Sequence, residues 1–198
     1  MDPFNSLATL AFLQNMVLKD KSVPSDSQAK QFGASQEAGF IAGKMAMVNG
    51  GISISGPINN AKINYAIVPL PTGKKQITTA FVNTWVIPKG AKNPDLSWRL
   101  VQYLSSKDGQ QIALDTGMGL PAAKGVDTAT FLKAHADNHY FIEAMDYAVP
   151  FPAPLYGADY FKAVETDLAL MWTGQQKLDD AVNKLAKSGS DILSGKPQ

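Results

Sequence analysis

The sequence predicts an α/β fold, because short runs rich in β-branched and aromatic residues alternate with longer stretches that have helical spacing. The clearest strand pattern covers residues 79–87, which hold phenylalanine, valine, isoleucine and tryptophan. The clearest helix start is Asn93-Pro94-Asp95, where an amide that can cap the helix precedes a proline at the first helical position. At 198 residues and 45% hydrophobic content, the chain is long enough to bury a core.

The first fifty residues predict two helical segments followed by a strand. Apolar residues at helical spacing indicate a helix over residues 4–19. Residues 25–35 are polar and are expected to form a loop, and residues 36–44 then make one or two helical turns. Residues 45–48 are expected to form a buried strand. Asn49-Gly50-Gly51 indicates a sharp turn, because glycine adopts the positive backbone dihedrals that a reversal needs.

Two further strands and two helices are predicted in the middle of the chain. Residues 63–69 and 79–87 have the composition of strands. The helix that begins at Pro94 is expected to be followed by a short helix over residues 107–114 and by a glycine-rich loop at residues 117–121. The inner face of the helix starting at Pro94 is predicted to consist of Leu96, Leu100, Val101 and Leu104.

The carboxy-terminal third predicts four helices. Residues 128–136 and 139–149 have helical patterns, and three prolines after the second of them require an extended chain. Helical periodicity returns over residues 156–172 and 178–185. Residues 189–198 are predicted to form a polar tail.

Composition excludes several functional classes. Eighteen basic and seventeen acidic residues leave a formal net charge of +1, so the chain lacks the positive field that holds nucleic acid. The chain has no cysteine, which excludes disulfides, thiolate zinc sites and cysteine nucleophiles. The longest apolar stretch, residues 7–18, is too short and too polar to span a bilayer, and the start lacks the basic region of a secretory signal.

No enzyme site can be assembled from the sequence. His135 and His139 are four residues apart, which would place both imidazoles on one helix face, but no adjacent glutamate completes a zinc motif. Neither Ser53 nor Ser55 lies in a nucleophile-elbow sequence. We therefore predict a protein that is not an enzyme and that uses no metal and no cofactor. A small α/β hydrolase or transferase, using either histidine with a carboxylate, is the alternative.

Aromatic and amide side chains lie at the ends of several predicted elements, which is typical of a pocket for a small polar ligand such as a sugar. A ring stacks on one face of the sugar, and amides hydrogen-bond to its hydroxyl groups. Core packing is the competing interpretation of the rings, and a module whose exposed aromatics bind a protein partner is a further alternative. The residues concerned are Asn49, Asn83, Trp85, Tyr156, Tyr160 and Phe161.

Eight short motifs follow one another in an order that covers residues 7–185. They are residues 40–47, Asn49-Gly50-Gly51, residues 64–71, residues 86–94, residues 105–111, Gly119-Leu120-Pro121-Ala122, residues 160–164 and Gly174-Gln175-Gln176. In this order they resemble the carboxy-terminal half of bacterial extracellular solute-binding proteins of the maltose-binding type.

The resemblance implies a periplasmic-binding-protein-like fold, in which two α/β lobes surround a hinged cleft that closes on a solute. Such a receptor delivers its solute, here a sugar, to the membrane permease of an ABC importer, and it works outside the cytoplasm, in the periplasm or on the outer cell surface. The chain would be a carboxy-terminal fragment, mostly the second lobe plus a crossing segment of the first. Residues 1–70 and 122–198 would belong to the second lobe, and residues 71–121 to the first.

The resemblance and the side-chain chemistry together suggest the ligand contacts. Maltose-binding relatives often place a tryptophan directly after the Asn49-Gly50-Gly51 position, where this chain has Ile52, whereas Phe161 falls near another stacking aromatic of the family. The expected contacts are Asn49, Gly51 and Ile52 at the turn, Asn83 and Trp85 on the crossing strand, and Tyr156, Tyr160 and Phe161 on the later helix.

The resemblance also suggests how the chain associates. The family's amino-terminal half has no counterpart here, so the strand of the crossing segment lacks the sheet that it would join. Phe81, Trp85 and Val86 on that strand would be exposed, and an unpaired strand tends to pair with another chain. We expect the fragment to form a swapped homodimer through this segment, or to fold mainly as the second lobe.

Overall fold

The described chain is mostly helical and contains one small parallel sheet. A computed structural model describes residues 3–33 and 35–195. The chain divides into two compact units: the terminal unit combines Met1–Gly39 with Pro152–Gln198, and the central unit is the continuous stretch Phe40–Phe151. Among the described residues, no helix is both long and apolar enough to cross a membrane.

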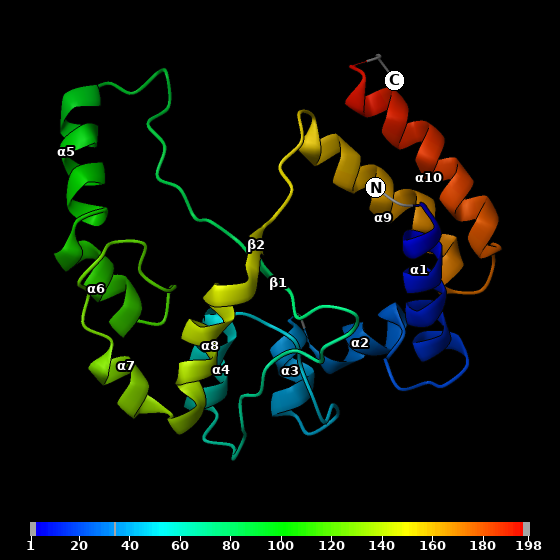
Figure 1. The fold of residues 1–198 in the computed structure, drawn as a ribbon, viewed down its shortest axis with the longest axis horizontal. Helices are drawn as coiled ribbons and strands as arrows, with labels where there is room; N and C mark the ends of the chain where they lie inside the picture. Colours follow the sequence, from blue (N-terminus) through cyan, green and yellow to red (C-terminus); the bar gives the residue numbers. More distant parts are fainter. Residues whose placement is uncertain (1–2, 34, 196–198) are drawn as a thin grey trace. The chain divides into compact units, whose positions relative to one another are not determined.

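Three long helices build the core of the terminal unit. They are α1 (Pro3–Leu18), α9 (Gly157–Trp172) and α10 (Leu178–Leu193), and they pack against one another (Figure 1). The apolar residues of α10 recur at helical spacing, so one face of this helix turns inward. Two short helices, α2 (Asp26–Phe32) and α3 (Gln36–Ile41), follow α1. The core consists of Leu168, Met171 and Ala181, flanked by Leu10, Val164, Trp172, Leu178 and Leu185.

The central unit consists of short elements joined by extended chain. Its buried side chains include Ile58, Leu114 and Phe131. The elements, in order, are η1 (Ile52–Ile54), α4 (Ser55–Asn60), β1 (Thr78–Ala80), α5 (Pro94–Leu104), α6 (Lys107–Asp115), α7 (Ala129–Ala134), η2 (Ala136–Asn138), α8 (His139–Glu143), η3 (Ala144–Tyr147) and β2 (Ala148–Pro150).

The sheet of the central unit joins β1 and β2 in parallel, with Thr78 opposite Ala148. The backbone N–H of Phe151 donates to the carbonyl of Ala80 at 3.0 Å and extends the pairing past β2. Beside this bond, the rings of Phe81 and Phe151 stack with their centroids 4.9 Å apart. The two segments thus meet through backbone and aromatic contacts together.

The helix starts after position 90 are confirmed, although one cap differs from expectation. Helix α5 begins at Pro94, but the Asn93 side chain makes no capping bond. Instead, the Asn93 carbonyl accepts from both the backbone N–H and the hydroxyl of Ser97, at 3.0 and 2.9 Å. Helix α6 begins at Lys107, where the Ser106 hydroxyl accepts from the Gly109 N–H.

The predicted strands are largely wrong. Residues 45–48 and 63–69 lie outside the strands that the structure describes, and of the run 79–87 only the first two residues belong to β1. A strand is stable only when a neighbour accepts its backbone hydrogen bonds. The N–H of Ile67, for example, donates at 3.0 Å to the Asp137 carboxylate rather than to another strand.

The polar segment 25–35, expected to be a loop, contains helix α2. Its start is a reciprocal capping box: the Ser25 hydroxyl accepts from the Gln28 N–H, and the Ser25 N–H donates to the Gln28 side chain. The spacing of this serine and glutamine, three residues apart, was visible in the sequence, and it predicts a helix start where the low hydrophobicity indicated a loop.

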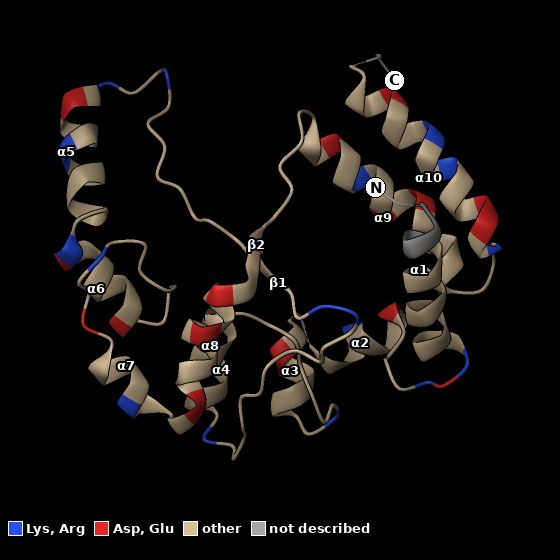
Figure 2. Ribbon diagram, in the orientation of Figure 1, with Lys and Arg blue, Asp and Glu red and all other residues tan. Residues whose placement is uncertain are grey.

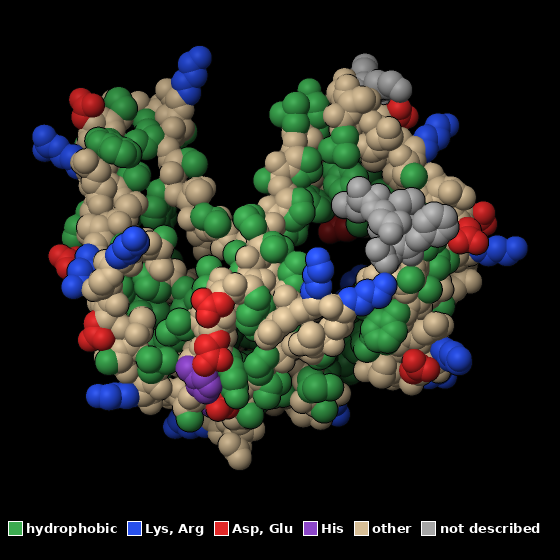
Figure 3. Space-filling model, viewed as in Figure 1, with side chains coloured by type: hydrophobic (Ala, Val, Ile, Leu, Met, Phe, Trp, Pro, Cys, Tyr) green, Lys and Arg blue, Asp and Glu red, His purple; other side chains and the backbone are tan. Residues whose placement is uncertain are grey.

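The expected inner face of α5 is only partly correct. Leu96 and Leu100 are 64% and 58% exposed, whereas Val101 and Leu104 are half-buried. Figure 3 shows hydrophobic side chains at the surface around α5. Helical spacing identifies which residues share a face, but the tertiary structure decides whether that face is covered.

The predicted polar tail is also wrong up to residue 193. Helix α10 continues through this stretch to Leu193, and both Gly189 and Ile192 are buried. Glycine is a poor helix former, which is why Gly189 suggested an end to the helix. Packing against α9 outweighs that local preference.

Candidate functional site

Three of the predicted ligand contacts lie together at the start of α9. Tyr156 is the N-cap residue, with φ 60° and ψ 28°, a left-handed conformation that a bulky residue rarely adopts. Its side chain is exposed, whereas Tyr160 and Phe161 are half-buried. The rings of Tyr160 and Phe161 meet edge to face, with centroids 5.6 Å apart and planes 74° apart.

A second group of predicted contacts lies in the central unit. Asn49 and Gly51 are exposed in a loop, and Ile52 is the half-buried first residue of η1. The expected positive dihedrals at this turn are absent, since neither Gly50 nor Gly51 has a positive φ. Glycine suits position 50 for a different reason: a side chain there would collide with the side chain of Ile54.

Asn83 and Trp85 lie in the extended segment that follows β1, outside any described strand. Both are exposed, Trp85 to 52%. Within the central unit, therefore, Trp85 is not a core residue, and its ring is accessible to a partner or a ligand.

The structure brings some predicted contacts together and leaves others apart. Tyr160 and Phe161 touch each other within the terminal unit, and Tyr156 begins the same helix. In the central unit, the loop that carries Asn49 and Gly51 is separate in sequence from the extended segment that carries Asn83.

The two histidines do not form the pair that their spacing suggested. Helix α7 ends at Ala134, and His135 is extended, with φ −151° and ψ 133°, so His135 and His139 do not share a helix face. The His135 Nδ1 accepts from the Asp137 N–H at 3.2 Å, and its ring stacks on Tyr65 with centroids 4.5 Å apart. The described residues contain no cluster of three or more His, Asp or Glu side chains that could hold a metal ion.

The tyrosine of this stack has a further partner. The Tyr65 hydroxyl donates to Asn59 Oδ1 at 2.6 Å. Burial raises the pKa of Tyr65, the bond to Asn59 acts against this rise, and the Asp137 charge adds to it. These contacts hold the chain around residues 59–67 to η2. They give Tyr65 and His135 a structural role in the central unit.

Sequence reasoning missed a buried charged contact between α9 and α10. Asp167 is 6% exposed, and its carboxylate accepts from the Ser188 hydroxyl at 2.5 Å and from Lys184 Nζ at 2.9 Å. The hydrogen bond from Ser188 lowers the pKa of Asp167, as does Lys184, although burial acts in the opposite direction. The available signal was an acidic residue three positions after Val164 on the inward face of the helix.

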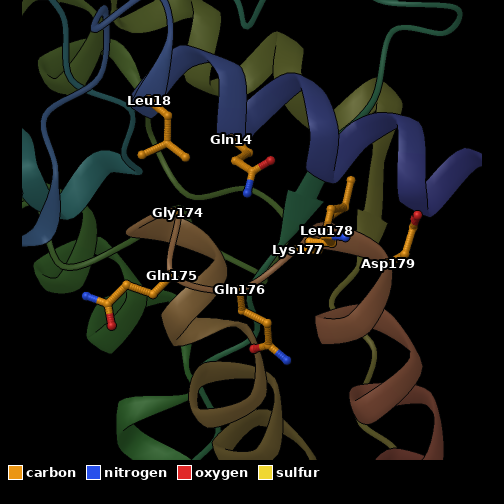
Figure 4. Close-up of a pocket in the computed structure, with 8 residues that line it drawn as sticks. All are labelled: Gln14, Leu18, Gly174, Gln175, Gln176, Lys177, Leu178 and Asp179. Carbon is orange, nitrogen blue, oxygen red and sulfur yellow. The ribbon is translucent and has the colours of Figure 1, made fainter.

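A hollow of about 570 Å³ lies between α1 and the loop that joins α9 to α10. Figure 4 shows Gln14 reaching from α1 toward this loop, and its Nε2 donates at 2.9 Å to the carbonyl of Met171 in the last turn of α9. None of the predicted ligand contacts lines the hollow. The lining residues are Gln14, Leu18, Gly174, Gln175, Gln176, Lys177, Leu178 and Asp179.

Acidic and basic residues both occur along α10, as Figure 2 shows. Lys184 on this helix pairs with an aspartate, and the first turn carries Asp179 and Asp180. This helix therefore carries no continuous basic stripe of the kind that tracks a phosphate backbone.

Comparisons with solved structures identify the fold. An ABC substrate-binding protein from Listeria monocytogenes, in complex with cycloalternan, superposes on 96% of this chain and 50% of its own, with a TM-score of 0.81 and 18% identity. The maltose-maltodextrin binding protein of Alicyclobacillus acidocaldarius superposes on 93% of this chain and 50% of its own, with a TM-score of 0.72 and 24% identity. The chain thus has a periplasmic-binding-protein-like fold over about half the length of these proteins.

Comparisons of sequence point the same way. A maltooligosaccharide ABC transporter solute-binding lipoprotein of Streptococcus pneumoniae is 30% identical over 42% of this chain and 20% of its own length. The maltodextrin-binding protein MdxE of Bacillus subtilis is 26% identical over 70% of this chain and 31% of its own. The matched regions are therefore about a fifth to a third of these curated relatives.

The sequence profile of one family matches most of the chain. The match covers residues 5–140, and the family is described as bacterial extracellular solute-binding protein. Its members bind solutes and are not enzymes, so the family match argues against the alternative hypothesis of a hydrolase or transferase. This chain belongs to the bacterial extracellular solute-binding proteins.

Proposed function

We propose that the chain is the solute-binding part of an ABC importer that takes up maltodextrin-type oligosaccharides. The observation that carries this proposal is the shared description of the sequence relatives, which are named for maltooligosaccharide and maltodextrin. The aromatic pair Tyr160–Phe161, beside exposed Tyr156, adds the side-chain chemistry that sugar rings need. The partner on the membrane side would be the permease of the importer.

The proposed ligand contacts combine rings with hydrogen-bonding groups. The rings would stack on the apolar faces of glucose units, while the amides and the backbone at the loop before η1 would bond to hydroxyl groups. Ile52 contributes an apolar contact instead of a stacking ring. The full set is Asn49, Gly51, Ile52, Asn83, Trp85, Tyr156, Tyr160 and Phe161.

The proposed lobe assignment follows the same family logic. Residues 1–70 and 122–198 belong to the second lobe and residues 71–121 to the first, so the described chain is mostly second lobe. Binding would then shift the hinged receptor toward its closed state, because the ligand contacts more groups when the cleft is closed.

The test is isothermal titration with maltose, maltotriose and longer maltodextrins. We expect Trp85→Ala and Phe161→Ala each to weaken maltotriose binding about tenfold, the loss of roughly 1–1.5 kcal/mol of stacking. Trp98→Ala is the matched control, since Trp98 is also an exposed tryptophan of the central unit, 55% exposed on α5. Failure of every sugar to bind or to raise the melting temperature would overturn the proposal.

We also propose that a second copy of the chain covers the segment after β1. Phe81, Val82, Trp85 and Val86 are 71%, 77%, 52% and 79% exposed. All four lie within six consecutive residues of the extended segment that follows β1. Such a stretch of extended, apolar chain favours pairing with another chain.

A further inference from the structure

We propose that Gly189 positions the aromatic pair of the candidate site. Because position 189 carries no side chain, the Tyr160 ring lies directly against the backbone of α10, and this seating sets the orientation of Phe161. The proposal rests on the proposed function only for its consequence on sugar binding, since the ring contacts themselves belong to the described terminal unit.

The contact between Gly189 and Tyr160 leaves no room for a methyl group. A Cβ built on Gly189 would lie 2.9 Å from Tyr160 Cε2 and 3.4 Å from Cδ2. The first distance is shorter than packed carbon atoms adopt, so an alanine would displace the ring. Gly189 is buried inside α10, where glycine is otherwise a poor choice.

The neighbouring residue prevents the helices from simply separating. Ser188 donates its hydroxyl to Asp167 at 2.5 Å, and Asp167 also holds Lys184. These bonds tie α10 to α9 one residue before Gly189. The easiest response to an added methyl group is therefore movement of the Tyr160 side chain, a rotation about single bonds, rather than movement of a helix.

Movement of Tyr160 must reach Phe161, because their rings touch edge to face with centroids 5.6 Å apart. An edge-to-face contact depends on the angle between the planes, here 74°. A displaced Tyr160 ring therefore changes the packing of the Phe161 ring and also its NMR chemical shifts.

A second glycine of this region shows why Gly189 is the cleaner probe. A Cβ on Gly195 would lie 3.4 Å from the Tyr156 hydroxyl, but Gly195 has φ 73°, so any substitution there also strains the backbone. Gly189 has no positive φ. An alanine at 189 therefore tests the steric contact without straining the backbone.

The experiment compares Gly189→Ala with Ser190→Ala, the exposed neighbour on the same helix, in the full chain. Aromatic proton resonances of Phe161 and Tyr160 are measured by NMR, together with maltotriose affinity. We expect shifted resonances for both rings and at least a threefold loss of affinity in Gly189→Ala, and neither change in Ser190→Ala.

A second pair of variants guards against a general loss of folding. In a Tyr160→Ala background the methyl group has no ring to meet, so adding Gly189→Ala should raise the melting temperature by a few degrees, as alanine favours a helix interior. Unchanged ring resonances in Gly189→Ala, or a lowered melting temperature in the double variant, would overturn the proposal. Shifted resonances with unchanged affinity would also overturn it. If the wild-type chain binds no sugar and Gly189→Ala still shifts both ring resonances, the ring contact is upheld and the proposed function is rejected.

Discussion

Asp167 shows how a single residue can stabilise the pairing of two helices. Its carboxylate is buried between α9 and α10, where Ser188 and Lys184 both donate to it. A buried charge is tolerated when its hydrogen-bonding capacity is used in this way. Because Lys184 is more than half exposed, solvent screens its attraction to Asp167. The hydrogen bond from Ser188 therefore contributes more to stabilising the carboxylate.

We expect Asp167→Asn to lower the free energy of unfolding by roughly 1–3 kcal/mol at pH 7, because it removes charge-assisted bonds from a buried group. Urea unfolding measures the loss. Glu165→Gln is the control, since Glu165 is an exposed carboxylate two residues earlier on the same helix. Equal stability of the two variants would contradict the role of Asp167.

The same carboxylate predicts a pH dependence. Its pKa is lowered in the folded chain below the ordinary aspartate value of 3.8. The stabilisation is therefore complete above that value and is lost as the pH falls through the lowered folded pKa. Unfolding at pH 7 and at pH 3 should show the difference between wild type and Asp167→Asn shrinking in acid, and a constant difference would reject the mechanism.

At the scale of the element, local signals located the starts of the later helices better than the strands. The helix expected over residues 139–149, for example, begins at His139 but ends at Glu143, and residues 148–150 form β2. Helix α9 ends as expected at Gly174: the Gly174 N–H donates to the Met171 carbonyl, and the Gln175 N–H donates to Leu170. Helix α2 was missed although its capping box is local. Helix α10 was predicted too short, because the reason for its length lies in packing against α9 rather than in its own sequence.

We expect Gly174→Ala to lower the free energy of unfolding by about 1 kcal/mol. Gly174 has φ 74°, a conformation that disfavours any side chain, and a Cβ there would lie 3.4 Å from Leu18 of α1. Denaturant unfolding of Gly90→Ala supplies the control, because Gly90 has no neighbour within 4 Å and no positive φ. A loss no larger than that of the control would show that the α9 end tolerates a side chain.

At the scale of the whole molecule, the chain ends combine into one compact unit and the middle forms another. The central unit exposes many large apolar residues, among them Trp98 and Leu100 of α5 and Val86 of the segment after β1. Exposed apolar residues that lie together favour contact with another chain. This exposure is the observation behind the proposed contact with a second copy.

We expect light scattering of the purified chain to give a mass twice that of one chain at micromolar concentration. Val86→Lys should shift the mass toward that of the monomer, because a charge on extended apolar chain blocks pairing. Val68→Lys is the matched control, since Val68 is an exposed valine of the same unit outside this segment. A monomeric wild type, or a Val86→Lys variant that still dimerises, would refute the proposed second copy.

Much of what the sequence predicted concerns features that a few neighbouring residues decide. The proline at the start of α5 and the glycine after α9 act within one helical turn, and both helix boundaries agree with expectation, whereas the expected Asn93 side-chain cap is absent. The ordered motifs also identified the family, which the profile match confirms. The proposed ligand contacts were chosen from residue type and from the family resemblance, and they stay predictions.

The sequence by itself therefore determined the helix starts after position 90, the absence of cysteine ligands for zinc and the family. Only the tertiary structure decided which β-branched runs pair, that Tyr160 packs on Gly189, and that Asp167 is buried against Ser188. The physical reason is distance along the chain: capping acts over three or four residues, whereas strand pairing and helix packing join residues that lie tens of positions apart, and no local pattern encodes their partners.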